Sequence, residues 1–436
     1  MTIRNGKPKL LKSIIYLMLL ISFATSAFAQ TTPEPSLEAT LEIWGWDGAF
    51  VGLQAVDEKF KELYPNITLN YVARPSDDTN QQILLSATAG SGFPDISVMQ
   101  DHFVKRYAEF GILADITDFL APYRDSFPGY KLDLTSVDDR LFAVPWDGVP
   151  VAVFYRRDIF EAAGVDPASI KTWEDYFQAA ETILETTGVP MLYLQKAQQD
   201  GSLFSAMLRQ QGTGILAEDG TVLLDKDPRH VEVLNYLKRL WDAGVAADTD
   251  LFSDAGQRDV ANGKVATVIG EVWMGQVLAA QMAPEASGEW GIFELPAWAT
   301  GGGRAAGAGG SYLAVFEASE QKEAALAYLE FHALDAENQI EVYKTADVFP
   351  SLTTTYESPF FQEGVPYFAG QKVRALFAKV NNAVPPAGSA EIFDSDYGEM
   401  MELLVPELQS FAVGRQSAEE ALATAAQLIR DRTGRE

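Results

Sequence analysis

The chain has 436 residues, of which 47% are hydrophobic, no cysteine, and a formal net charge of −28. The lack of cysteine excludes disulfides, thiolate metal sites, cysteine nucleophiles and the lipidated cysteine of exported lipoproteins. So strong a negative charge disfavours binding to nucleic acid and to anionic membrane surfaces, and the length predicts about two or three domain-sized units.

The amino terminus has the pattern of a secretory signal peptide. Four basic residues at positions 4–12 precede an apolar run at 14–24, and Ala27-Phe28-Ala29 fits a cleavage site. The apolar run is shorter than the roughly 20 residues that span a bilayer, which disfavours an uncleaved anchor. Removing residues 1–29 takes away four positive and no negative charges, so the net charge changes from −28 to about −32. We expect cleavage after Ala29 and a mature protein that diffuses in a periplasm.

The first part of the mature chain alternates strands with helices. Residues 40–44, 67–72 and 94–99 are predicted strands, and residues 51–63 and 80–88 are predicted helices. A strand-helix-strand-helix-strand order predicts a parallel sheet.

Aromatic and acidic side chains follow two of these strands. Trp46 and Asp47 come directly after the first strand, and Asp101 follows the third. Because ligands of open parallel sheets bind beyond the carboxyl ends of the strands, these residues are predicted to face one crevice. Asp101 could instead be only a turn or helix-capping acid.

Residues 141–158 contain two short apolar runs on either side of Trp146-Asp147-Gly148. The pattern predicts two buried strands that meet at a loop exposing an aromatic ring and a carboxylate, an arrangement suited to ligand capture. Taken alone, the segment also fits an ordinary strand pair in which Asp147 only forms a turn.

The middle of the chain predicts a second α/β unit. Thr172 and Asp175 form the amino-terminal cap of a helix that extends to residue 187. Further helices are predicted at 203–211 and 230–243, and further strands at 191–194, 265–270 and 290–296. The loop after the strand at 265–270 carries Trp273, so another tryptophan follows a strand.

Residues 300–310 are the most glycine-rich stretch and precede a predicted strand at 311–316. A phosphate-binding loop would need a following helix and, in the Walker form, a Lys-Ser or Lys-Thr pair, so these glycines instead predict a tight backbone crossing. A helix is predicted at 321–334, and Ser417 with Glu420 forms the capping box of a terminal helix.

The sequence contains no clear catalytic or metal-binding motif. No Gly-x-Ser-x-Gly elbow occurs, and the three histidines, His102, His230 and His332, lack metal-ligand spacing and are predicted to lie at the surface or in helix packing. The acidic stretches 248–250 and 394–399 resemble calcium loops only faintly. We therefore predict no catalytic residue, no metal and no cofactor.

Taken in order, several segments resemble the carbohydrate-binding family 1 of periplasmic solute-binding proteins, the maltose-binding-protein-like receptors of ABC transporters. The similar segments are the first strand with its Trp-Asp turn and residues 92–96, 141–158, 172–175, 263–266, 309–310, 322–331 and 414–422. The resemblance implies an α/β fold of two lobes joined by hinge crossings. It implies a first lobe of residues 31–146 plus 309–352, and a second of residues 147–308 plus 353–436.

Sugar chemistry suggests which residues bind. Apolar pyranose faces stack on aromatic rings, and vicinal hydroxyls pair with carboxylates or amides. The predicted ligand-binding residues are Trp46, Trp146 and Trp273 for stacking, Asp47, Asp101 and Asp147 as hydroxyl acceptors, Gln82 and Gly310 for amide and backbone contacts, and Phe349. Any of the tryptophans could instead belong to a core, as we predict for Trp173, Trp241 and Trp290.

The resemblance implies a monomeric receptor that captures a sugar or polyol between its lobes and delivers it to ABC transporter permease subunits. It implies no enzymatic activity. Two alternatives stay open at this point, a secreted carbohydrate-active enzyme with a deep cleft and a receptor for another polar solute. A short basic or zwitterionic ligand would also suit an acid-rich pocket.

Overall fold

The computed structural model describes residues 35–197, 201–217, 219–307, 309–385 and 396–436. The predicted signal peptide lies outside these ranges, as do the first two residues of the acidic stretch 394–399. No helix in the described ranges is long and apolar enough to cross a membrane.

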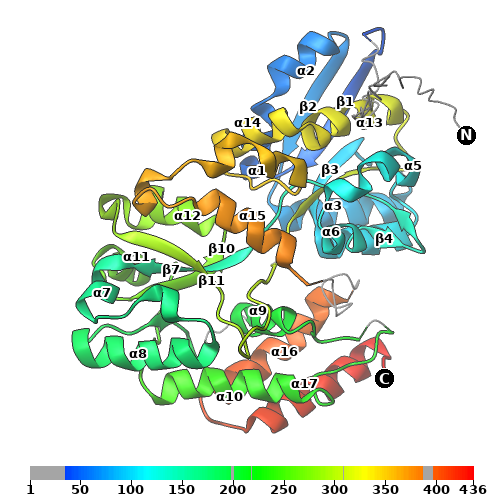
Figure 1. Cartoon of the computed structure of the whole chain (residues 1–436). Coiled ribbons are helices and arrows are strands. Elements are labelled where there is room, and N and C mark those ends of the chain that lie inside the picture. The colour runs from blue at the N-terminus through cyan, green and yellow to red at the C-terminus, as the bar shows by residue number, and fades with distance from the viewer. Residues whose placement is uncertain (1–34, 198–200, 218, 308, 386–395) are drawn as a thin grey trace, which may run out of the picture. The chain divides into compact units, whose positions relative to one another are not determined.

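The first sheet gathers strands from separated parts of the chain (Figure 1). Its members, in the order β2-β1-β3-β12-β6, are β2 (Ile67–Ala73), β1 (Ala39–Gly45), β3 (Ile96–Gln100), β12 (Ser311–Val315) and β6 (Val144–Pro145). β1 pairs in parallel with β2 and β3, which confirms the predicted parallel sheet. β12 pairs antiparallel with β3 and β6, so the late chain segment returns to complete the sheet.

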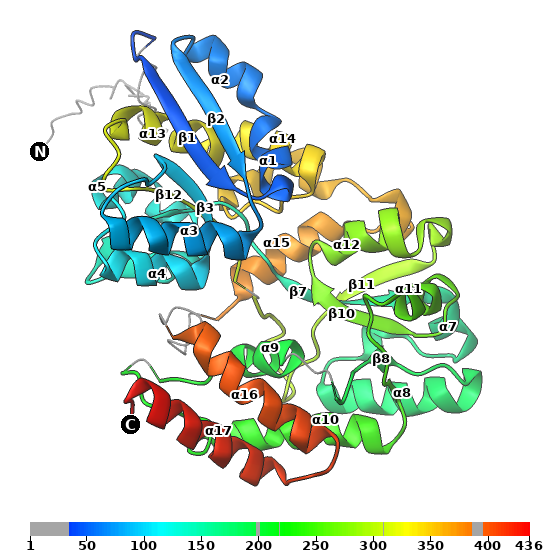
Figure 2. The same cartoon turned by 180° about the vertical axis from the view of Figure 1, so that it is seen from behind.

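Side-chain alternation buries both faces of this sheet. Ile43 and Leu313 belong to one hydrophobic cluster, and their neighbours Trp44 and Tyr312 belong to another on the opposite face. The helices packed on the two faces are α1 (Asp47–Gln54), α2 (Asp57–Leu63) and α13 (Lys322–Leu329) on the first, and α3 (Ser76–Ala89) and α4 (Asp101–Glu109) on the second. Figure 2 shows α3 and α4 side by side.

Two predicted helices are divided in the structure. The single helix predicted at 51–63 is wrong, because Val56 leaves the helical conformation (φ −117°, ψ 2°) and separates α1 from α2. The break allows Phe50 and Phe60 to be buried in the same cluster. The helix predicted at 321–334 is α-helical only as far as Leu329 and continues as a π-helical turn.

The second sheet has the order β10-β7-β11 and is antiparallel throughout. Its strands are β7 (Val151–Arg156), β10 (Thr267–Glu271) and β11 (Trp290–Glu294). Every residue of β7 is buried, with Val153 and Phe154 in clusters on opposite faces. A strand buried on both faces is expected to be an unbroken apolar run, which explains the composition of this segment.

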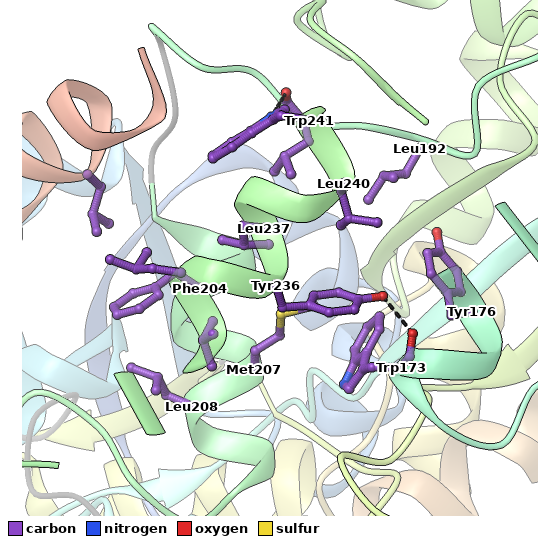
Figure 3. Packing of buried hydrophobic residues seen from close by; sticks show 14 of the residues in the cluster. Trp173, Tyr176, Leu192, Phe204, Met207, Leu208, Tyr236, Leu237, Leu240 and Trp241 are labelled. Atoms are coloured by element: carbon purple, nitrogen blue, oxygen red, sulfur yellow. Dashed lines mark hydrogen bonds between the residues drawn. The ribbon is translucent and has the colours of Figure 1, made fainter. Parts of the chain in front are cut away.

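One face of the second sheet packs against a large helical core (Figure 3). Trp173 and Tyr236 lie against each other in this core, and the Tyr236 hydroxyl donates to the Trp173 carbonyl over 2.9 Å. The Trp241 ring nitrogen donates to the Leu194 carbonyl over 2.8 Å. Trp290 is fully buried in the cluster on the other face, so the packing roles predicted for Trp173, Trp241 and Trp290 are confirmed.

Two helices around the second sheet, α8 (Trp173–Thr187) and α17 (Ala418–Thr433), begin at the caps that the sequence predicts. Thr172 and Ser417 each form a capping box, with Asp175 and Glu420 respectively. The helices around this sheet are α7 (Arg157–Ala162), α8 (Trp173–Thr187), α9 (Ser202–Gln210), α10 (Pro228–Asp242), α11 (Asp254–Ala261), α12 (Met274–Val277), α15 (Val373–Ala383), α16 (Tyr397–Ala412) and α17 (Ala418–Thr433). The remaining elements outside 3₁₀ and π turns are α5 (Thr117–Leu120), α6 (Gly129–Asp133), β4 (Ser136–Val137), β5 (Arg140–Leu141), β8 (Leu192–Tyr193), β9 (Ala246–Ala247) and α14 (Ala336–Ala346).

Three chain segments pass between the two sheets. They are residues 146–150 after β6, residues 305–307 and 309–310 before β12, and residues 347–352 after α14. Backbone bridges join Asp147 to Pro350 and Pro150 to Gly307, so the three segments lie side by side. The predicted lobe boundaries fall in or near these segments and stay a prediction.

Candidate functional site

A cavity of about 690 Å³ lies beside the crossing segments. Residues from the end of β3, the crossings, α9, the exit of β10 and the start of α16 contribute to its lining. The lining residues discussed below are Asp101, His102, Asp147, Arg209, Phe252, Trp273, Gly310, Ser311 and Tyr397. The cavity is therefore built from segments spread over most of the chain.

Four of the nine predicted binding residues line this cavity, namely Asp101, Asp147, Trp273 and Gly310. Trp46, Asp47 and Gln82 lie outside its lining. Trp46 packs partly against the first core, Asp47 is exposed at the start of α1, and Gln82 is partly buried on α3.

Trp146 and Phe349 are core residues in the structure. Trp146 is 1% exposed, which is contrary to the exposed ring predicted for its loop, and it packs so closely on α1 that a Cβ at Gly52 would lie 3.2 Å from the indole. Phe349 is also 1% exposed and belongs to the aromatic cluster beneath the second sheet. Both rings contribute to packing next to the crossings.

Asp101 contributes an acceptor to the cavity. It begins α4 directly after β3, and its backbone N–H donates to the Gly310 carbonyl over 3.3 Å. Its Oδ1 accepts from the His102 backbone N–H at 2.9 Å and lies 3.3 Å from the His102 ring. Its Oδ2 is buried and has no hydrogen-bond partner among the described residues. A buried carboxylate oxygen without a donor is costly, and the Asp101 side chain that carries it lines the cavity.

Gly309 and Gly310 bring the backbone against two carboxylates. Both have positive φ, +94° and +133°. A Cβ on Gly309 would collide with the Asp101 carboxylate, and a Cβ on Gly310 would lie 2.6 Å from both Asp147 Oδ1 and Lys131 Nζ. Glycine is therefore required here by both conformation and space, as the predicted tight crossing implies.

Asp147 joins two crossing segments. One carboxylate oxygen accepts from the Ser311 backbone N–H and the other from the Ser311 hydroxyl, and the next residue, Gly148, donates to the Phe349 carbonyl over 2.7 Å. Burial raises the pKa of Asp147, while the Lys131 ammonium and the Ser311 hydrogen bonds oppose that rise. Asp147 thus both faces the cavity and fixes the crossings.

An aromatic surface forms the other side of the cavity. Trp273 follows β10 and is 38% exposed, and Phe252 is 52% exposed. The two rings stack with centroids 6.3 Å apart and an interplanar angle of 30°. Such a pair offers a flat apolar face next to the acidic groups.

Polar side chains of α9 and α16 complete the lining. Arg209 donates to the Tyr397 hydroxyl over 3.3 Å and to the Gly307 carbonyl over 3.5 Å. The His102 and Tyr397 rings lie 5.8 Å apart. His102 is partly exposed and lines the cavity. His230 and His332 are fully buried, as predicted for helix packing.

Sequence reasoning missed His102, Arg209, Phe252 and Tyr397. A signal for Arg209 was present, since Ser202, Ser205 and Arg209 share one face of α9 and all three line the cavity. A polar stripe on an otherwise apolar helix indicates either solvent or a site, and only the fold decides between them.

Comparison with known proteins gives three findings about this chain. The profile of the bacterial extracellular solute-binding proteins matches residues 48–339. The arabinooligosaccharide-binding protein of Bacillus subtilis (strain 168) is 29% identical over 330 residues, which cover 73% of this chain and 74% of that one. The lactose-binding protein of Rhizobium radiobacter is 27% identical over 371 residues, which cover 82% of this chain and 86% of that one.

A solved structure has the same fold. The sugar-binding protein MalE from Xanthomonas citri superposes with a TM-score of 0.77 and covers 90% of this chain and 96% of its own. The sequence identity in that superposition is 20%, so the likeness concerns the fold alone.

Proposed function

The chain belongs to the bacterial extracellular solute-binding proteins, with the two-lobed fold of MalE-like proteins, and from this premise we propose that it is the saccharide receptor of an ABC importer. In this role the protein captures a short oligosaccharide in the cavity beside its crossings and presents it to permease subunits. It makes and breaks no covalent bond. Binding favours a closed arrangement of the lobes and so shifts an open-closed equilibrium.

The observation that carries the proposal is one cavity holding both an unsatisfied carboxylate and an exposed aromatic pair. Asp101 Oδ2 lacks a donor among the described residues, and a sugar hydroxyl is such a donor. Trp273 and Phe252 present a flat apolar surface for a pyranose or furanose face. A ligand that needs both contacts at once is polar at its edge and apolar on its face, which describes a sugar.

The named relatives support an oligosaccharide in preference to a single small polyol. They bind arabinooligosaccharide and lactose according to their names. The cavity of about 690 Å³ lies within the roughly 300–1,000 Å³ typical of small-molecule sites. Asp101, Trp273, Phe252, Arg209 and Tyr397 are the ligand contacts that we assign, with Asp147 and Gly310 holding the crossing at the cavity's edge.

We assign the mature receptor to the periplasm as a monomer, after cleavage behind Ala29. Four basic residues, an apolar run and Ala27-Phe28-Ala29 support that assignment. Sequencing the amino terminus of the exported protein tests it. A terminus at Gln30 agrees with the assignment, and a retained leader contradicts it.

The test of the function is thermal unfolding of the mature protein against a panel of ligands. The panel contains lactose, arabinobiose, arabinotriose and maltose, a polyol (sorbitol), amino acids and polyamines, and each ligand is recovered and analysed by mass spectrometry. A saturable rise in Tm with an unchanged saccharide supports the receptor. A chemically altered saccharide indicates an enzyme, and a rise only with amino acids or polyamines overturns the saccharide assignment.

A further inference from the structure

We propose that Lys131 is a positioning residue of the ligand site, whose buried ammonium balances the Asp101 and Asp147 carboxylates and thereby makes ligand affinity depend on its charge. Lys131 lies on the short helix α6 and is fully buried. It does not belong to the cavity's lining as described above, so it acts through the two acids. The inference rests on the proposed function, because it concerns the ligand of the same cavity.

The ammonium is held by the glycine crossing and lies near the rings of Tyr130 and Tyr312. Lys131 Nζ donates to the Gly309 carbonyl over 3.1 Å and lies 4.3 Å from the centroid of the Tyr312 ring. A lysine ammonium has three donors, and a single acceptor among the described residues leaves much of its charge to be balanced by nearby anions. A buried lysine costs the most free energy when its charge is not compensated.

The anions that compensate it line the cavity. A Cβ placed on Gly310 would lie 2.6 Å from Lys131 Nζ and 2.6 Å from Asp147 Oδ1, so the two charges face each other across this glycine. Asp101 stands on the adjacent side, where its carboxylate meets Gly309. The absence of side chains at both glycines therefore leaves room for Lys131 and the two carboxylates around this crossing.

The pKa of Lys131 depends on the charges of the two carboxylates. Burial lowers the pKa of Lys131 to about 8, and Asp147 and then Asp101 oppose the decrease. The titratable groups that face this cluster are Asp101 and His102 from α4, Asp147 from the crossing after β6, Tyr312 from β12, and Tyr130 and Asp133 from α6 itself. The charge of Lys131 therefore changes just above neutral pH.

Ligand binding changes the hydration of Asp147 but not that of Lys131. Lys131 has no exposed surface left, so a ligand removes no water from it, whereas Asp147 is only partly buried and faces the cavity. When a ligand displaces water from the Asp147 carboxylate, the attraction between this carboxylate and the Lys131 ammonium becomes stronger. The stronger attraction favours the protonated form of Lys131. Binding is therefore expected to raise the pKa of Lys131 above its value in the free protein.

Ligand affinity is therefore expected to decrease at alkaline pH. If the ligand-bound protein holds the Lys131 proton more tightly, ligand affinity is highest below pH 8. It decreases as the pH rises first through the pKa of Lys131 in the free protein and then through its pKa in the bound protein. The decrease is at most about tenfold per pH unit. A lysine that only fills space would leave affinity flat over this range.

The experiment combines affinity and direct titration. Calorimetry between pH 6.5 and 9.5 uses the saccharide that raises Tm most among lactose, arabinobiose, arabinotriose and maltose, with the wild type, Lys131→Met and the control Lys61→Met, an exposed lysine on α2. The wild type is expected to lose affinity above pH 8. Lys131→Met is expected to bind about tenfold more weakly or worse at pH 7, because the carboxylates lose their counter-charge, and to lack the decrease near pH 8. Lys61→Met should match the wild type.

A second measurement needs neither ligand nor a stable Lys131 variant. The ¹³Cε signals of labelled lysines in the free wild-type protein should include one that titrates near pH 8, well below the ordinary range of the others. His102→Gln should keep the alkaline decrease in affinity, since His102 is a separate neighbour of Asp101.

The outcomes separate the two proposals. An affinity that stays flat from pH 6.5 to 9.5 in the wild type, or lysine signals that all titrate normally, overturns the role of Lys131 while leaving the saccharide receptor intact. If no saccharide in the panel binds, the proposed function fails and this role of Lys131 fails with it, even if one lysine titrates near pH 8.

Discussion

The two sides of the cavity are built in different ways. The acidic side, formed by Asp101, Asp147 and the Gly309–Ser311 crossing, is fixed by backbone hydrogen bonds and buried charge. The aromatic side, formed by Phe252 and Trp273, consists of side chains that are 52% and 38% exposed. We therefore expect the orientation and affinity of the bound saccharide to depend mainly on the rigid acidic side. The selectivity among saccharides should depend on the aromatic side.

The largest effect is expected from Gly310→Ala. The new Cβ would meet Asp147 Oδ1 and Lys131 Nζ at 2.6 Å, and a φ of +133° is unfavourable for alanine. We expect loss of saccharide binding and a decrease of about 3 kcal/mol or more in the free energy of unfolding, measured by calorimetry and urea denaturation. The matched control is Gly90→Ala, which also has positive φ (+68°) but nothing within 4 Å of its Cβ.

Gly90→Ala should lower stability by only about 1 kcal/mol and leave binding unchanged. If Gly310→Ala and Gly90→Ala change binding and stability to the same extent, the acidic side tolerates a side chain as well as an open position does. The proposed rigidity of this side would then be wrong.

Asp101→Asn is expected to weaken saccharide binding by about 10- to 100-fold, because hydrogen bonds to a charged acceptor contribute about 1.5–3 kcal/mol. Stability should decrease as well, because the buried Lys131 ammonium loses one of its two compensating carboxylates. Calorimetry at pH 7 and thermal unfolding measure the two effects. Asp77→Asn, an exposed acid in the first turn of α3, is the control and should bind like the wild type. Equal affinities of Asp101→Asn and the wild type would remove Asp101 from the site.

Trp273→Ala tests the aromatic side. We expect about a tenfold loss of affinity, equivalent to about 1.4 kcal/mol, and a Tm within a few degrees of the wild type because the ring is already 38% exposed. The variant should also alter the ranking of saccharides in the panel. Phe110→Ala removes a ring that is 53% exposed at the carboxyl end of α4 and serves as control. An unchanged ranking would mean that Trp273 does not contribute to selectivity.

The smallest effect is expected from Phe252→Ala. Phe252 stacks on Trp273 at 6.3 Å, so it orients that ring and adds area at the edge of the cavity. The affinity should decrease about two- to fivefold, in line with roughly 0.5–1 kcal/mol for an aromatic pair. In the Trp273→Ala background the same substitution should have almost no effect. Additive losses, measured by a double-mutant cycle, would show instead that Phe252 contacts ligand independently.

Much of the fold could be predicted because its signals are local. Strand alternation, the capping boxes at Thr172 and Ser417 and the glycines before β12 each depend on neighbouring residues. Asp101 was predicted by the same means, since the carboxyl end of a strand is a position that the sequence reveals.

Residues whose role depends on distant contacts could not be predicted. The exposure expected for Trp146 was wrong because its ring packs on α1, almost a hundred residues earlier in the chain. Lys131 and Arg209 read as ordinary polar helix residues until the fold brings Gly309 and Tyr397 beside them. Such long-range packing leaves no periodic pattern in the sequence.

The most direct test of the account is calorimetric titration of the mature wild-type protein with lactose, arabinobiose, arabinotriose and maltose, followed by chromatography of the recovered sugar. The account predicts saturable binding of at least one of them at one site per chain, with the sugar recovered unchanged. No binding of any of these saccharides, or recovery of a cleaved product, would contradict it.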